Sequence, residues 1–265
     1  MRLKISHTTS YAFENPVTYG LQQLRKTPKS GHGQQVLSWE TEVICGQKQV
    51  SFEDHHNNRV DTISFEKGCE TLTVISRGEV ELDDIHGIVG RHTALAPLWL
   101  FQDTTELTHP GTGVRQLLRG LDDRPDLDRL HALSQAVLGA VAYEIGTSHP
   151  ELTAEQALAQ GRGVCQDHTH VFLACAREIG FPARYVSGYL MLDDRVAQDA
   201  MHAWAEVHVE GLGWVGFDVS NGISPDTRYV RVATGLDYAQ AAPVIGTTLG
   251  GGGETLSVQI EVAQQ

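Results

Sequence analysis

The hydrophobic pattern of this chain changes period near residue 105, and that change limits the folds open to it. Before residue 105, apolar and polar residues alternate over short runs, with polar or glycine-containing turns between them. The runs cover residues 3–13, 36–44, 47–53, 60–65 and 71–76. Alternation with a period of two is typical of strands that bury one face. We therefore expect an all-β, sandwich-like N-terminal domain, in which Asn15-Pro16 ends the first strand and Gly78 ends the fifth.

After residue 105 the apolar residues recur at spacings of three and four, which predicts helices. One amphipathic helix is expected over residues 127–141, a short one over 154–159 and a long one over 165–179. Thr153 and Gln156 have the spacing of a capping box, which supports the start of the short helix. Strands are then expected at 185–192, 202–209 and 214–219, with a hairpin turn at 210–213. This part of the chain is therefore expected to contain helices followed by strands.

The last segment contains a glycine run, residues 250–253, followed by an alternating run at 256–262. We interpret the glycines as a flexible linker and the alternation as a final strand, whose partner lobe the sequence leaves open. The chain of 265 residues is thus expected to divide into three parts. These are a β domain at 1–105, a core at 106–248, and a linker with a C-terminal strand at 249–265.

Charge and cysteine content exclude several classes of protein. The chain has 33 acidic and 20 basic residues, a net charge of −13, which disfavours nucleic-acid and anionic-membrane partners. The N-terminus lacks the apolar core of a signal peptide, and no run approaches the ~20 apolar residues of a spanning helix. Four cysteines with no CxxC pair fit neither a disulfide scaffold nor a thioredoxin-like motif. A cytoplasmic protein is expected, and its oligomeric state is left open.

Two cysteines share the long helix expected at 165–179, but their settings differ. Cys165 begins the helix, where the positive end of the helix dipole and free backbone N–H groups favour the nucleophilic thiolate. The same N–H groups could receive an oxyanion. Cys175 lies deeper among apolar residues and is expected to be a buried small hydrophobe. Cys165 is therefore the candidate nucleophile.

A nucleophilic cysteine needs a base, and the base needs an acceptor that orients it. His202 opens the strand expected at 202–209, and Asp218 lies near the end of the strand that returns after the hairpin. The two residues become approximate cross-strand neighbours in that hairpin. The sequence therefore predicts a cysteine at a helix start beside a His–Asp pair.

These residues lie in motifs that resemble the transglutaminase-like superfamily. The matching stretches are residues 161–168, 182–189, 202–207 and 213–218, while residues 7–11, 16–17 and 24–25 resemble the β-rich N-terminal domain of bacterial members. The resemblance covers most of the chain and implies a papain-like α+β core, with a nucleophile helix packed on an antiparallel sheet. It also implies that Cys165 is the nucleophile, His202 the general base and acid, and Asp218 the orienting group. One departure from related tails is Thr247-Thr248-Leu249, which precedes the glycine run.

Other polar residues near these motifs have simpler interpretations. His168 is an alternative base or a local modulator of pKa, Asp167 contributes to the first-turn dipole or an ion pair, and Glu206 and His208 belong to a polar network or the surface. Arg162 and Arg184 are expected in structural ion pairs, with binding of a substrate carboxylate as the minority alternative. Trp204, Trp214 and Phe217 are expected to pack around the hairpin. His55-His56 could hold only an adventitious metal, because no zinc spacing or HExxH motif is present.

The resemblance implies acyl transfer from a peptide or small amide through a thioester, with no cofactor and no metal. A cysteine-dependent amide hydrolase is favoured, namely a peptidase, isopeptidase or amidase, over an acyltransferase. The alternative is a catalytically inactive peptide-binding module with the same fold, and a metallohydrolase comes third. The second oxyanion-hole donor cannot be assigned from the sequence.

Overall fold

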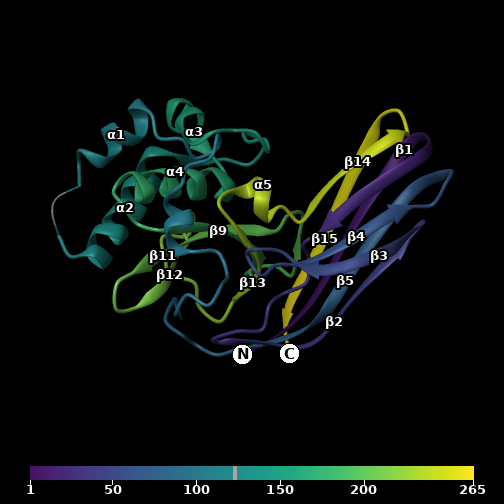
Figure 1. Ribbon diagram of the computed structural model, residues 1–265, viewed down its shortest axis with the longest axis horizontal. Helices are drawn as coiled ribbons and strands as arrows, with labels where there is room; N and C mark the ends of the chain where they lie inside the picture. The colour runs from purple at the N-terminus through teal and green to yellow at the C-terminus, as the bar shows by residue number, and fades with distance from the viewer. Residues whose placement is uncertain (122–123) are drawn as a thin grey trace.

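A computed structural model describes residues 1–121 and 124–265. It shows two lobes, one with all of the helices around a short sheet and one built from long strands (Figure 1). The N- and C-termini lie close together because the first strand, β1 (Arg2–Leu24), pairs antiparallel with the last, β15 (Glu254–Gln264). Both ends of the chain therefore belong to the strand-rich lobe.

The strand-rich lobe consists of four long strand paths, each bent near its middle. One path is β1, and the others are β2 (Gln34–Ile44) with β3 (Gly46–Glu53), β4 (Arg59–Phe65) with β5 (Cys69–Leu82), and β14 (Val244–Gly250) with β15. β5 and β15 flank the first half of β1, whereas β4 and β14 flank its second half. β2 and β3 continue the sheet beyond β5 and β4.

The bend folds this sheet back on itself. Phe13 in the first half of β1 lies 6.0 Å, centroid to centroid, from Phe65, which packs over Gly20 in the second half. The halves enclose one apolar core, made of Tyr11, Phe13, Val17, Leu24, Ile63, Phe65, Cys69, Leu72 and Val74. The sandwich-like architecture expected from the alternation is thus confirmed.

Two of the expected interruptions take a different form. β1 does not end at Asn15-Pro16 but passes through this dipeptide. The pairing of β1 with β5 shifts its register between Ala12 and Val17, so that Pro16, which has no N–H, interrupts no hydrogen bond of that ladder. The glycine run lies opposite this dipeptide: Gly251 and Gly252 have φ of 83° and 68°, and Gly251 O accepts from Asn15 N at 2.9 Å. The run is therefore the bend of a paired strand rather than a linker.

Gly78 does not end the fifth strand either, since β5 continues to Leu82. A Cβ on Gly78 would lie 2.1 Å from Ser38 O and 2.7 Å from Trp39 Cε3. The glycine therefore permits close packing of β2 on β5. The predicted division of the chain into three parts stays a prediction, but β14 and β15 attach residues 244–264 to the strand-rich lobe.

The other lobe places its helices on one face of an antiparallel sheet, as the α+β expectation required (Figure 1). The sheet has the order β13 (Tyr229–Gly235), β9 (Ala183–Leu190), β11 (His202–Val209), β12 (Gly213–Phe217) and β6 (Ile88–Gly90). The helices are α1 (Thr112–Leu118), α2 (Asp126–Ala140), α3 (Ala154–Gln160), α4 (Cys165–Glu178) and α5 (Tyr238–Ala241). The remaining short elements are η1 (Leu98–Gln102), β7 (Ala142–Tyr143), β8 (Arg162–Gly163) and β10 (Ala197–Gln198).

Helix α4 is the centre of this lobe. Eleven of its residues, from Asp167 to Arg177, are buried. It packs against Ala203, Ala205 and Val207 on one face of β11, where small side chains allow the helix to approach the sheet. The capping box that starts α3 is present, with Thr153 and Gln156 bonded reciprocally. In the part of the chain that the structure describes, no helix is long and apolar enough to cross a membrane.

The lobes share an apolar core at the end of β9 and the start of β13. It contains Leu3, Ile5, Val80, Leu82, Tyr189, Val230, Val232, Ile260 and Val262. A polar chain crosses the same junction. Lys26 Nζ donates to Thr9 Oγ1, Thr9 Oγ1 lies 3.1 Å from His7 Nε2, and His7 Nδ1 lies 3.1 Å from the Tyr189 hydroxyl. Burial lowers the pKa of Lys26 to about 7.

A lysine whose pKa is lowered by folding makes stability depend on pH. Between the folded pKa of about 7 and the ordinary value of 10.5, the unfolded chain binds the proton and the folded chain does not. Stability from this group therefore rises with pH across that window, by up to about 1.4 kcal/mol per pH unit. We expect Lys26→Met to be more stable than wild type near pH 7, with the difference shrinking toward pH 10. Urea unfolding of both proteins at several pH values measures it; a constant difference would contradict the prediction.

Candidate active site

Cys165 is the first residue of α4, at the position expected from the sequence. Val164 before it is extended and donates its N–H to Asp167 Oδ2 at 2.7 Å, while Asp167 Oδ1 accepts from the Ser148 hydroxyl at 2.8 Å. Asp167 therefore caps the helix. Gly163 is required for this contact, because a Cβ there would lie 2.7 Å from the Asp167 side chain. The cap fixes the backbone from which the partly exposed Cys165 thiol projects.

His202 and Asp218 meet as the hairpin predicts. His202 begins β11, and Asp218 follows directly after β12, whose register with β11 pairs Ala205 with Phe217. His202 Nε2 lies 2.6 Å from Asp218 Oδ2, so that the ring donates to the carboxylate. The period-two strand and the tight turn are therefore sufficient to form this pair.

Asp218 is fully buried and has further donors that the sequence did not reveal. The Tyr229 hydroxyl and Asn221 Nδ2 each donate to Oδ2 at 2.7 Å, and the backbone N–H of Asn221 reaches Oδ1 at 3.3 Å. Burial alone would raise the pKa of Asp218, but the bonds from His202, Asn221 and Tyr229 outweigh it and hold that pKa below its ordinary value. The carboxylate stays charged opposite His202.

The imidazole of His202 joins Asp218 to Cys165. Cys165 is close enough for its charge to act on the ring, and because Nε2 is used by Asp218, Nδ1 is the nitrogen left for the sulfur. Burial lowers the pKa of His202, but the charge and hydrogen bonds of Cys165 and Asp218 reverse this and raise it to about 10. A cationic ring beside the sulfur stabilises a thiolate by charge attraction.

Trp204 and Tyr229 pack beside the His202 imidazole. The Trp204 ring is stacked with His202 at 6.3 Å and meets Tyr229 edge to face at 5.4 Å. Both aromatic residues are buried. Trp204 therefore packs beside the hairpin, as expected, and at the same time limits rotation of the His202 ring.

His168 is bonded elsewhere and does not face the sulfur as a base would. Its Nε2 lies 2.8 Å from Val141 O, which can only accept, so Nε2 carries the proton. Nδ1 then accepts from the Ser220 hydroxyl at 2.8 Å. Burial lowers the pKa of His168 and keeps the ring neutral. The bond from His168 to Ser220 therefore attaches the loop after Asp218 to α4.

The remaining polar residues near the motifs mostly form structural contacts. Glu206 is fully buried between Arg184 and Arg231, at 2.6 Å from Arg184 Nη2. Arg162 pairs with Glu144 at the surface. His56, considered for an adventitious metal, bonds through Nε2 to Gln240 Oε1 at 2.9 Å. Among the residues described, no three His, Cys, Asp or Glu side chains cluster as a metal site would require.

Comparisons with known proteins show what this chain is similar to. Residues 115–219 match the family model of the transglutaminase-like superfamily, and residues 3–81 match that of the bacterial transglutaminase-like N-terminal region. An uncharacterized protein of Mycobacterium leprae is 29% identical over 99% of this chain and 99% of its own length, and one of Mycobacterium bovis is 28% identical over 92% and 87%. The crystal structure of a "putative cysteine protease" from Cytophaga hutchinsonii superposes with a TM-score of 0.79 at 18% identity, over 99% of this chain and 90% of that one.

The site predicts unequal reactivity of the four cysteines. Cys165 is partly exposed beside cationic His202, whereas burial raises the pKa of Cys175 and of Cys69 to about 12. At pH 7 we expect iodoacetamide to modify Cys165 first and to leave Cys69 and Cys175 unmodified in the folded protein. His202→Gln should slow modification of Cys165 about tenfold or more, since it removes the neighbouring charge. Peptide mapping measures each rate, and equal slow rates at all four thiols would contradict the prediction.

Proposed function

Because this chain carries a transglutaminase-like superfamily core behind a bacterial transglutaminase-like N-terminal region, we propose that it is a cysteine-dependent amide hydrolase. The observation that carries the proposal is the connected series of side chains from Cys165 through His202 to Asp218. The substrate class is a peptide or small amide. Water is proposed as the acceptor, because the resemblance implies hydrolysis for many bacterial members.

The proposed reaction follows from the roles of these three groups. The Cys165 sulfur attacks the carboxamide carbon, and the carbonyl electron pair moves onto oxygen. As the C–N bond breaks, cationic His202 gives its Nδ1 proton to the leaving amine and a thioester remains. Water then gives a proton to His202 while its oxygen attacks the thioester, and the C–S bond breaks to release the acid and restore the sulfur anion. Asp218 keeps the ring oriented throughout.

The developing oxyanion needs donors that are in place before the reaction. The backbone N–H of Cys165 lies in the first turn of α4, where N–H groups have no partner within the helix. We propose the Tyr143 hydroxyl as the second donor. β7 pairs in parallel with β8, and this register sets Tyr143 beside Gly163, two residues before the nucleophile. Tyr143 is half-exposed, and burial together with the charges of Cys165 and Asp218 raises the pKa of its hydroxyl, which stays protonated.

Replacing the nucleophile tests the proposed function. Wild type and Cys165→Ala are incubated with peptide, isopeptide and small amide libraries, and products are followed by mass spectrometry. We expect turnover by wild type only, and an acyl adduct on Cys165 when the reaction is quenched in acid. Cys165→Ala should unfold at the same denaturant concentration as wild type, because the substitution removes one sulfur at a partly exposed position. Turnover that persists in this variant would rule out the mechanism.

Removing the Tyr143 hydroxyl tests the second donor. Loss of one oxyanion-hole donor typically lowers kcat about 10²–10³-fold. We expect Tyr143→Phe to lower kcat toward that range on the substrate found in the screen, while KM and the rate of Cys165 alkylation change little. Tyr19→Phe, at a half-exposed tyrosine of β1, is the matched control. A Tyr143→Phe enzyme with unchanged kcat would exclude this residue as a donor.

A further inference from the structure

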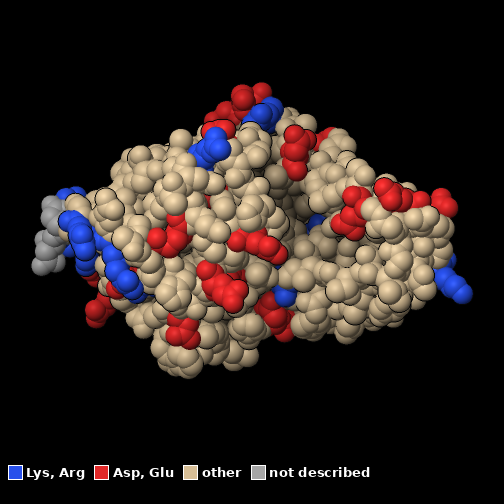
Figure 2. All heavy atoms as spheres, turned by 90° about the horizontal axis from the view of Figure 1, so that it is seen from above, with Lys and Arg blue, Asp and Glu red and all other residues tan. Residues whose placement is uncertain are grey.

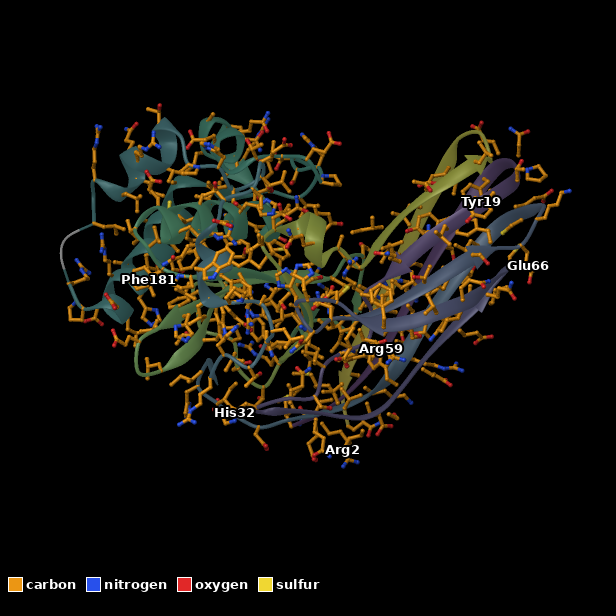
Figure 3. All side chains as sticks on the ribbon, viewed as in Figure 1. Arg2, Tyr19, His32, Arg59, Glu66 and Phe181 are labelled. Carbon is orange, nitrogen blue, oxygen red and sulfur yellow. The ribbon has the colours of Figure 1, made fainter. Side chains whose placement is uncertain are left out.

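A cavity of about 1200 Å³ lies at the junction of the lobes, away from the candidate triad. Its lining includes His32 and Arg59, which are labelled in Figure 3. The strand-rich lobe contributes residues 27–32, 39–41 and parts of β3 and β4, and the other lobe contributes Arg184, Trp214 and Arg231. Cys165, His202 and Asp218 do not line it.

This cavity is basic in an otherwise acidic protein. The basic side chains that line it are Lys29, Lys48, Arg59, Arg91, Arg184 and Arg231. The acidic ones are Glu40, Glu53 and Asp61. The lining therefore carries an excess of three positive charges, while the whole chain has a net charge of −13. Acidic side chains are prominent on the outer surface on both sides of the hollow between the lobes (Figure 2).

Three of the basic side chains in the lining have too few carboxylate partners to neutralise their charges. Arg184 and Arg231 share the single carboxylate of Glu206. Lys29 Nζ donates to two neutral acceptors, His56 O at 3.0 Å and Thr234 Oγ1 at 3.1 Å. Burial, followed by repulsion from Arg231 and Arg184, lowers the pKa of Lys29 well below its ordinary value. An anion placed among these groups would relieve that repulsion.

The guanidinium groups are also held in fixed positions. The Arg184 guanidinium lies 4.0 Å from the centroid of the Trp214 ring and is bonded to Glu206. Arg231 Nε and Nη2 both donate to the same carboxylate. Planar guanidinium groups that are already ordered lose little entropy on binding an oxyanion, and they match carboxylate and phosphate oxygens in geometry.

We propose that the cavity between the lobes is a binding site for a small polyanion bearing carboxylate or phosphate groups. Lys29, Lys48 and Arg59 would contact it from the strand-rich lobe, Arg184 and Arg231 from the other, and Arg91 at the rim. A long polyanion such as nucleic acid is disfavoured, because the acidic outer surface repels it while a small ion fits within the cavity. Such a ligand bridges the lobes and therefore stabilises the folded protein. This role is separate from the proposed amide chemistry.

Two probes and three variants test the site. Inorganic triphosphate and citrate are titrated into the full chain by calorimetry at constant ionic strength, and thermal unfolding is measured with each. We expect saturable binding of at least one probe, with a rise in Tm. Binding by triphosphate alone identifies a phosphate ligand, and binding by citrate alone a carboxylate ligand.

The variants distinguish this site from general charge effects. Arg91 is exposed at the rim, so Arg91→Gln should fold as wild type yet weaken binding about tenfold, the effect of one charge-assisted hydrogen bond. Lys29→Gln tests the interior in the same way. Arg119→Gln changes an exposed arginine outside the cavity and should leave affinity unchanged. Absence of saturable binding by both probes, or equal loss in Arg91→Gln and Arg119→Gln, would overturn the proposal.

Discussion

The buried carboxylate of Asp218 is the constraint on which the arrangement of the site depends. A charged group with no exposed surface is costly unless its oxygens are bonded, and removing one partner of a buried pair typically costs about 3–5 kcal/mol. Its donors are His202 from β11, Asn221 from the loop after β12 and Tyr229 from β13. Three segments of the sheet region must therefore be in register before the carboxylate is satisfied. The contacts that stabilise Asp218 also point His202 toward Cys165. Folding of the sheet region therefore preorganises the site.

The strand-rich lobe packs against this sheet at the end of β9 and the start of β13. Its first and last strands pair with each other, and Leu3, Ile5, Ile260 and Val262 pack against Tyr189 and Val230 of the core sheet. Because β14 and β15 come from the end of the chain, the lobe is complete only after the helices and the core sheet have been synthesised. The two lobes are therefore interdependent parts of one fold, although their sequence patterns differ.

Local sequence patterns predict much of the fold. The features that they do not predict depend on pairing between strands that lie far apart in the sequence. The helix start at Cys165 and the meeting of His202 with Asp218 follow from periods of 3.6 and 2 and one tight turn, so the sequence predicted them. Asn15-Pro16 and the glycines at 250–253 were read as ends of structure, since proline and glycine serve loops and bends alike. Only the pairing of residues 244–264 with β1 reveals that both are the bend of a folded sheet. Tyr229 carried no local signal for its bond to Asp218, because strand order places it there.

The two faces of β11 contact different parts of the molecule. Ala203, Ala205 and Val207 face α4 and let this helix approach the sheet closely. The alternate residues form a polar and aromatic row: His202 at the site, Trp204 stacked beside it, and Glu206 between Arg184 and Arg231 of the basic cavity. His202 and Glu206 thus project from the same face of one short strand, with the buried Trp204 between them. The register of β11 on β9 therefore sets the position of the imidazole in the candidate site and of the carboxylate that orders the guanidinium groups of the cavity.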